Sequence, residues 1–120
     1  MREARRVWTV SGGKEDAGRP RPVVIVQDDG FDATDSITIC AFTTDPTEAP
    51  LFRLVVEPNE RNGLRHICRL MADKTTTVPK STMGTRVGRL DDEVMVRLNR
   101  AMAVFLGMAV SPRSGRTQAS

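Results

Sequence analysis

The sequence predicts a mainly β protein with one helix, in which a small, strongly curved antiparallel sheet closes into a barrel that the helix caps. Three observations predict this fold. Short β-branched runs recur along the first three quarters of the chain, polar turn-forming stretches separate them, and one amphipathic helical pattern follows the last of them. At 120 residues the chain matches one domain, predicted at 1–109, with a disordered polar tail at 110–120.

The composition argues against one mode of nucleic-acid binding and does not require another. With 18 basic and 15 acidic residues the net charge is only +3, so nothing in the composition forces a broad electrostatic grip on nucleic acid. Aromatic residues make up 4% of the chain, which argues against binding of single strands mainly by base stacking. A local basic site remains compatible with these numbers.

The sequence also predicts a cytoplasmic protein. Cys40 and Cys68 lie in apolar, strand-like contexts and read as buried thiols of a reducing compartment. The charged N-terminus does not resemble a signal peptide, and no apolar stretch approaches the roughly 20 residues that span a bilayer. We therefore expect no membrane partner.

The first two strands flank a glycine-rich loop. Residues 6–10 have strand composition, 11–18 form the loop, and 23–26 are four β-branched residues typical of a buried strand. Arg19 and Arg21 each precede a proline, which favours extended backbone at both positions. The second strand should therefore begin with a positioned positive charge.

The third and fourth strands are predicted at 37–44 and 52–56. Alternation with a period of two puts Thr43 on the same face as Ile37 and Ile39. Thr43 therefore ends a mostly apolar face.

A turn at Asn62-Gly63 leads to a long mixed strand at 67–78, bent or bulged near Asp73. The remaining elements before the helix are one helical turn at 79–84 and a short strand at 86–90.

The helix begins after Asp91, a good N-cap, and runs to about Leu106, with Gly107 as its stop. Its first turn is acidic, as the helix dipole favours. The apolar stripe predicted to face the core is Val94, Leu98, Ala101, Met102 and Phe105.

Four segments in order then carry a resemblance to a known family. They are a strand containing Val7-Trp8 before a glycine-rich loop, the run Arg21-Pro22-Val23-Val24-Ile25-Val26-Gln27, a strand ending Ala41-Phe42-Thr43, and Gly88-Arg89-Leu90 before the closing helix. From about Val7 to Leu106 the chain resembles the MazF/PemK toxins of toxin–antitoxin modules. The resemblance implies an SH3-like barrel of the CcdB/PemK type, a homodimer, and control by a MazE-like antitoxin. It also implies sequence-specific cleavage of single-stranded RNA, specifically mRNA, with no metal or other cofactor.

Carried over by position, the family's catalytic pair is Arg21 and Thr43, and the chemistry suits both residue types. A guanidinium forms charge-assisted, bidentate hydrogen bonds to a phosphate, and a hydroxyl both donates and accepts. Because the pKa of arginine lies above about 12, we assign Arg21 to phosphate stabilisation first and proton transfer second. Without the resemblance, Arg21 and Thr43 would read as ordinary sheet residues.

Four further residues are expected to contact the RNA: Arg19, Gln27, Lys74 and Arg86. Lys74 lies where many family members carry a glutamine, a departure that bears on base preference. The single histidine, His66, has no second histidine with which to form an acid–base pair and is expected to be exposed.

Two alternatives of other classes remain open at this point. One is a non-enzymatic toxin on the same fold, like CcdB, which would bind DNA gyrase through residues near 104–108 of the last helix. The other is a barrel that binds nucleic acid or peptide without cleaving it, which salt-dependent binding without products would indicate.

Overall fold

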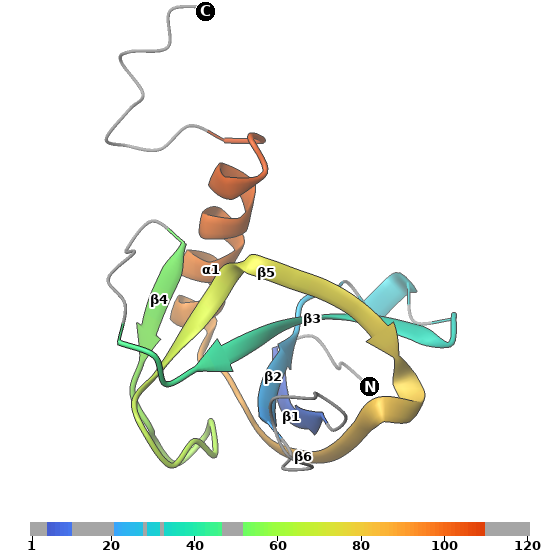
Figure 1. Cartoon of the computed structure of the whole chain (residues 1–120), viewed down its shortest axis with the longest axis horizontal. Helices are drawn as coiled ribbons and strands as arrows, with labels where there is room; N and C mark the ends of the chain where they lie inside the picture. The colour runs from blue at the N-terminus through green and yellow to red at the C-terminus, as the bar shows by residue number, and fades with distance from the viewer. Residues whose placement is uncertain (1–4, 11–20, 28, 32, 47–51, 110–120) are drawn as a thin grey trace, which may run out of the picture.

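The computed structural model describes residues 5–10, 21–27, 29–31, 33–46 and 52–109. Figure 1 shows a curved sheet with one helix packed beside it. The elements are β1 (Arg6–Val10), β2 (Arg21–Ile25), the 3-10 turn η2 (Asp29–Phe31), β3 (Ser36–Thr43), β4 (Arg53–Val56), β5 (Cys68–Pro79), the 3-10 turn η3 (Lys80–Thr82), β6 (Met83–Arg89) and α1 (Asp92–Phe105). Each predicted strand is present, although β2 and β6 begin earlier than expected.

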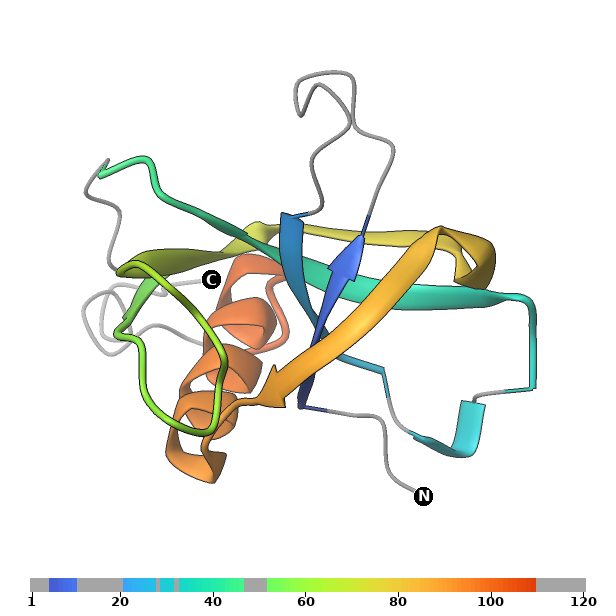
Figure 2. The same ribbon diagram turned by 90° about the horizontal axis from the view of Figure 1, so that it is seen from below.

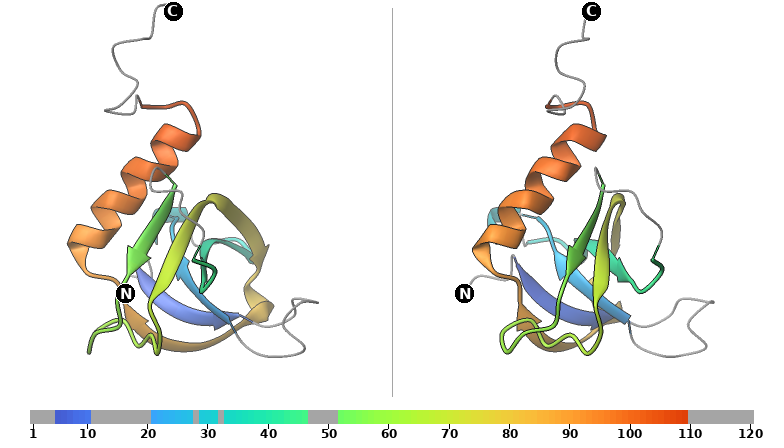
Figure 3. Two further views of the ribbon diagram at one scale, coloured as in Figure 1. Left: turned by 60° about the vertical axis from the view of Figure 1, so that its left-hand side comes forward. Right: turned by 90° about the vertical axis from the view of Figure 1, so that its left-hand side faces the viewer.

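The six strands form one antiparallel sheet in the order β4-β5-β3-β2-β1-β6. β4 and β6 are its two edges, and no ladder joins them in the described residues. The predicted closure into a barrel is therefore not confirmed, whereas the strong curvature is evident in Figures 1, 2 and 3. In Figure 1, β5, η3 and β6 together form a continuous arc around one side of the molecule.

The loop between β4 and β5 lies against β6. The backbone N–H of Arg89 donates to the carbonyl of Arg61 over 2.8 Å. Gly63 has a φ of +72°, and a Cβ there would lie 2.3 Å from the carbonyl oxygen of Val87. A Cβ on Gly88 would lie equally close to the carbonyl oxygen of Arg61. Glycine at both positions therefore permits this close backbone contact.

Two apolar clusters occupy opposite faces of the sheet, because neighbouring residues of a strand point to opposite sides. One cluster packs under α1 and includes Val7, Val24, Cys40 and Phe42. The other is built on Val23, Ile25, Ile37 and Ile39, with Trp8, Val10, Ala41, Val78 and Met83 packed against it. The central strands are thus buried on both faces.

The helix α1 covers β4 and part of β5 (Figure 3). Its buried residues are Met95, Leu98 and Ala101, and Val94 and Met102 pack at the margin. The predicted stripe therefore omitted Met95. No described helix has the length and apolar character that crossing a membrane requires.

Two details at the ends of α1 differ from expectation. Phe105 is 51% exposed, although its ring centroid lies 6.0 Å from that of Phe52. Asp91 occupies the N-cap position, but its carboxylate makes no capping bond to the helix. It instead accepts hydrogen bonds from Arg61 Nε at 2.6 Å and Asn59 Nδ2 at 3.3 Å.

The predicted bulge in β5 is confirmed. Cys40 pairs with Thr75 and Phe42 with Leu70, so β5 contains extra residues between these two pairs. Within the bulged segment, Asp73 forms a bidentate ion pair with Arg53 of β4, at 3.1 Å to Nε and 3.3 Å to Nη2. Both side chains are largely buried. This pair ties the bulge to the edge strand.

Candidate active site

Arg21 is the first residue of β2 and is half-buried. Its sequence neighbour Pro22 fixes the extended backbone from which the strand starts. On β1, Val10 is its directly opposed partner. Strand alternation points the Arg21 side chain to the same face as Val23 and Ile25, away from α1.

Thr43 ends β3 beside the start of β2. The β2–β3 ladder pairs Ile25 with Ile39 and Val23 with Ala41. Arg21 and Thr43 each lie two residues beyond the last of these pairs, at matching positions on the same face. The structure therefore brings the two sequence-predicted catalytic residues to one end of two neighbouring strands.

Arg69 of β5 lies beside Thr43 on the next strand and was not identified from the sequence. The β3–β5 ladder pairs it with Thr43, and the β4–β5 ladder pairs it with Val55. Its neighbours Cys68 and Leu70 are buried under α1, so Arg69 points to the opposite face, as Thr43 does. We call Arg21, Thr43 and Arg69 the guanidinium row.

The Thr43 hydroxyl is held in a local turn. Its Oγ1 accepts a hydrogen bond from the backbone N–H of Asp45 over 3.1 Å. A threonine hydroxyl has two lone pairs and one proton, so this bond fixes the oxygen and leaves its O–H able to donate. The row thus combines one oriented hydroxyl with a guanidinium on the strand at each side.

The residues expected to bind RNA are not all brought to this row. Gln27 lies past the other end of β2, about 20 Å along the strand direction from Arg21. Its Oε1 accepts from the N–H of Thr38 at 2.9 Å, and its Nε2 donates to the carbonyl of Phe31 at 3.3 Å. Gln27 therefore closes the connection between β2 and β3.

The other three predicted contacts lie elsewhere. Lys74 is exposed next to the bulge of β5. Arg86 lies on β6 and lines a second basic site. Arg19 falls outside the described residues.

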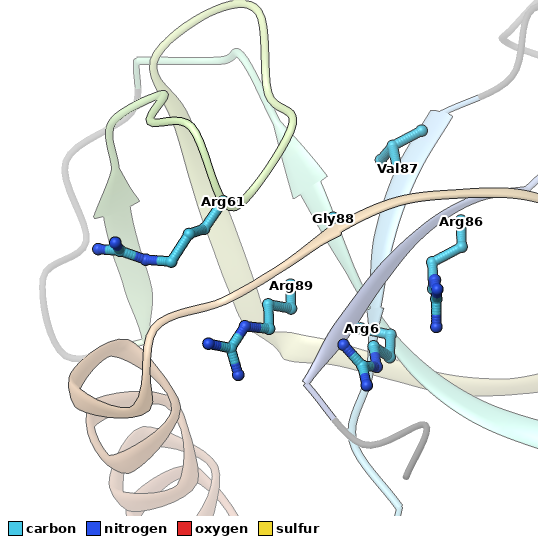
Figure 4. Close-up of a pocket in the computed structure, with 6 residues that line it drawn as sticks. All are labelled: Arg6, Arg61, Arg86, Val87, Gly88 and Arg89. Atoms are coloured by element: carbon cyan, nitrogen blue, oxygen red, sulfur yellow. The ribbon is translucent and has the colours of Figure 1, made fainter. Parts of the chain in front are cut away.

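This second site is a pocket of about 350 Å³ between β1, β6 and the β4–β5 loop (Figure 4). Arg61, which lines this pocket, forms an ion pair with the carboxylate of Asp91. That hydrogen bond holds the pKa of Asp91 below its ordinary value. The lining residues are Arg6, Arg61, Arg86, Val87, Gly88 and Arg89.

Both cysteines are buried thiols, as predicted. Burial raises the pKa of Cys40 from 9.0 to about 12, and Cys40 Sγ donates to the carbonyl of Met71 over 3.3 Å. Burial also raises the pKa of Cys68. Neither thiol is ionised near neutral pH, so neither is a nucleophile there. In the described part of the chain, no three His, Cys, Asp or Glu side chains are grouped as metal ligands would be.

Comparison with known proteins agrees with the mainly β fold. The model of the PemK-like, MazF-like toxins of type II toxin–antitoxin systems matches residues 4–106. The chain is 50% identical over 103 residues to a probable endoribonuclease MazF of Mycolicibacterium smegmatis (strain ATCC 700084 / mc(2)155), covering 86% of this chain and 94% of the relative.

Solved structures share the fold at lower identity. An endoribonuclease in complex with its cognate antitoxin, from a mycobacterial species, superposes with a TM-score of 0.74 at 21% identity, covering 90% of this chain and 97% of that one. The Mycobacterium tuberculosis toxin MazF-mt6 superposes with a TM-score of 0.73 at 20% identity, covering 88% of this chain and 99% of that one. With the family model matched over most of its length, the chain belongs to the PemK-like, MazF-like toxins of type II toxin–antitoxin systems.

Proposed function

We propose that this toxin cuts single-stranded mRNA at specific sequences without a metal ion, and that Arg21 and Thr43 are catalytic, with Arg69 acting beside them. The chain belongs to the family and is 50% identical over 103 residues to a probable endoribonuclease MazF, so it is an endoribonuclease. The observation that carries the assignment of the site is the guanidinium row, in which a hydroxyl lies between two arginine-bearing strands.

The row suits cleavage of RNA by its own 2′-hydroxyl. The 2′-oxygen attacks the adjacent phosphorus and loses its proton, the bond from phosphorus to the 5′-oxygen breaks, and the leaving oxygen takes up a proton. The products carry a 2′,3′-cyclic phosphate and a 5′-hydroxyl. Negative charge builds on the non-bridging oxygens in the transition state, and fixed positive charges at that place usually supply a large share of catalysis.

Each residue of the row has a role in this scheme. Arg21 and Arg69 donate hydrogen bonds to the non-bridging oxygens, since guanidinium geometry matches a phosphate. Thr43, with its oxygen fixed by Asp45, orients the phosphate or the 2′-hydroxyl. Proton transfer is a secondary role for Arg21, because a guanidinium holds its proton too firmly to be an effective acid or base.

The proposal includes a homodimer controlled in the cytoplasm by a MazE-like antitoxin. Support for the antitoxin comes from related toxins solved with theirs, among them a mycobacterial endoribonuclease and MazF of Deinococcus radiodurans. The homodimer is supported by large apolar side chains that are exposed in the single chain and that a partner surface would cover. They are Ile67, Val96, Phe105, Leu106 and Met108. Sedimentation as a monomer at micromolar concentration would contradict the dimer.

The test is incubation of purified, antitoxin-free protein with a long single-stranded RNA in EDTA. Wild type is compared with Arg21→Ala and with Arg97→Ala, a control that removes an exposed charge from α1. We expect discrete cuts by wild type and the control, and none by Arg21→Ala; mapping the ends gives the recognition sequence. Intact RNA with folded wild type would instead favour a non-catalytic toxin.

A further inference from the structure

The basic pocket shown in Figure 4 lies at the Arg6 end of β1 and contains a pair of arginines that does not favour folding of the sheet. In the β1–β6 ladder, Arg6 is directly opposite Arg89. Like charges at directly opposed positions of antiparallel strands repel and destabilise the sheet. Two arginines in this position place two positive charges side by side, and a bound anion would offset their repulsion.

A register shift adds a third arginine to the same face. Val7 pairs with Gly88, but Trp8 pairs with Arg86, so Val87 is an extra residue in β6. The shift aligns Arg86 with Trp8, which lies on the Arg6 side of β1. Figure 4 shows Arg86 and Arg89 extending to one side of β6, together with Arg6, and Val87 to the other.

Hydrogen bonding to Arg61 lowers the pKa of Asp91 at the start of α1 and the charge of Arg89 helps to lower it, but the acidic residues there make their hydrogen bonds with other groups. Asp91 is bound by Arg61 and Asn59, and Asp92 is paired with Arg5. In the part of the chain that the structure describes, neither Arg86 nor Arg89 has an ion-pair partner. Their charges thus face an open pocket at the protein surface.

The pocket and the guanidinium row lie at opposite ends of β1. Arg6 lies four residues along β1 from Val10, the partner of Arg21, which is about 13 Å at the rise of a strand. One phosphate cannot contact both sites. The described residues that line the pocket carry no hydroxyl, carboxylate or histidine, so they can bind an anion but supply no group for acid–base or nucleophilic catalysis.

We propose that Arg6, Arg86 and Arg89 form a binding site for a phosphodiester of the RNA chain outside the bond that is cut. This inference rests on the proposed function, since it takes RNA as the ligand. Guanidinium groups recognise phosphate oxygens irrespective of the base, so the site holds RNA independently of sequence. It adds affinity for long substrates to the catalysis at the guanidinium row.

The test is the salt dependence of binding to uncleavable RNA. Oligonucleotides of 2′-O-methyl uridine and of 2′-O-methyl adenosine lack the attacking hydroxyl, and their binding is measured over a range of salt concentrations. The double variant Arg86→Gln/Arg89→Gln should bind both about tenfold more weakly at low salt. The slope of log affinity against log salt should be shallower by about 0.7 for each phosphate that the variant no longer binds.

The matched control is Arg97→Gln/Arg100→Gln, which removes the same charge from exposed positions of α1. It should keep the wild-type slope. An equal change in the control would attribute the effect to net charge and overturn the site, as would a wild-type slope in the pocket variant. Loss of affinity for the antitoxin with unchanged RNA binding would also overturn it and assign the pocket to a protein partner.

The unfolding temperature of the variant distinguishes loss of the site from a folding defect, and the combined cleavage and binding results distinguish this inference from the proposed function. The pocket variant should unfold at the same temperature as wild type or a higher one, because it relieves like-charge repulsion; a lower temperature would contradict the argument. If wild type cuts RNA and the pocket variant binds as wild type does, only the pocket assignment fails. If wild type neither binds nor cuts RNA, the proposed function fails.

Discussion

Arginines gather at both ends of β1, yet the two groups differ in what accompanies them. The guanidinium row places half-buried Arg21 and Arg69 beside the oriented hydroxyl of Thr43. The pocket at the other end places exposed Arg86 and Arg89 around open solvent, and none of the described residues that line it carries a hydroxyl. Binding of phosphate needs only the cations, whereas its reaction also needs groups fixed where charge and protons move. The comparison therefore separates catalysis from attachment on one sheet.

The largest effect is expected for Arg21→Ala. It should lower the rate of RNA cleavage about 10²- to 10³-fold, because it removes a fixed donor to the oxygens that gain charge. Single-turnover cleavage with saturating RNA measures this directly. Arg21→Lys should recover only part of the rate, since an ammonium lacks the bidentate geometry. Full activity of Arg21→Lys would show that charge alone suffices.

Arg69→Ala should lower the same rate about 10²-fold. Its place opposite Thr43 predicts an effect on the reaction at saturation, not only on the affinity for RNA. Val55→Ala, which changes the β4 partner of Arg69, is the matched control and should leave the rate near that of wild type. If Arg69→Ala lowers only the affinity for RNA and leaves the rate at saturation unchanged, Arg69 binds the substrate and takes no part in the reaction.

Thr43→Val should reduce cleavage about tenfold or more, because the hydroxyl that orients the reacting groups is lost with the shape retained. Thr43→Ser restores an oxygen that can accept from the N–H of Asp45 and should recover most of the rate. If the serine variant is as slow as the valine variant, the hydroxyl is not what Thr43 contributes.

Asp73→Asn tests the framework that aligns the row. The Asp73–Arg53 pair is largely buried, and its loss leaves a charged guanidinium without its carboxylate. We expect the free energy of unfolding to fall by about 2 kcal/mol in urea titrations. Lys74→Gln, beside it but exposed, should change stability little. Equal stability of both variants would show that the pair does not hold the bulge.

The smallest effect concerns Cys40, in the core shared by β3 and α1. Its pKa in the folded protein is raised to about 12 from an ordinary 9.0, so the folded state favours the neutral thiol. Its contribution to stability is complete below pH 9 and is lost as the pH rises from there toward 12. Cys40→Ala should be less sensitive to pH than wild type in this range, as measured by urea unfolding. Identical pH profiles would contradict the raised pKa.

Local patterns predicted most of the fold, because each depends on near neighbours. The β-branched runs, Gly63 at its turn and the bulge near Asp73 all appear where the sequence indicates. Closure of the barrel was not confirmed. It would require the edge strands β4 and β6 to pair, and strand pairing is decided by long-range contacts that a local pattern does not contain. Asp91 failed as a cap because Arg61, thirty positions away in the chain, takes its carboxylate.

The candidate site was predicted in part for the same reason. The resemblance supplied Arg21 and Thr43 by position, and the strand order then placed them together. Arg69 was missed because nothing local distinguishes it: a charged residue between two buried ones fits any half-exposed strand. The alternation around Cys68 and Leu70 predicts its face, but only the ladder reveals that Thr43 lies opposite.

The most direct test of the account is single-turnover cleavage in EDTA at saturating RNA, comparing Arg21→Ala with Arg86→Gln/Arg89→Gln. We expect the rate at saturation to be about 10²- to 10³-fold lower for Arg21→Ala and unchanged for the pocket variant, which only needs more RNA to saturate. Cleavage by Arg21→Ala at the wild-type rate, or an equal loss of saturating rate in both variants, would contradict the separation of catalysis from attachment.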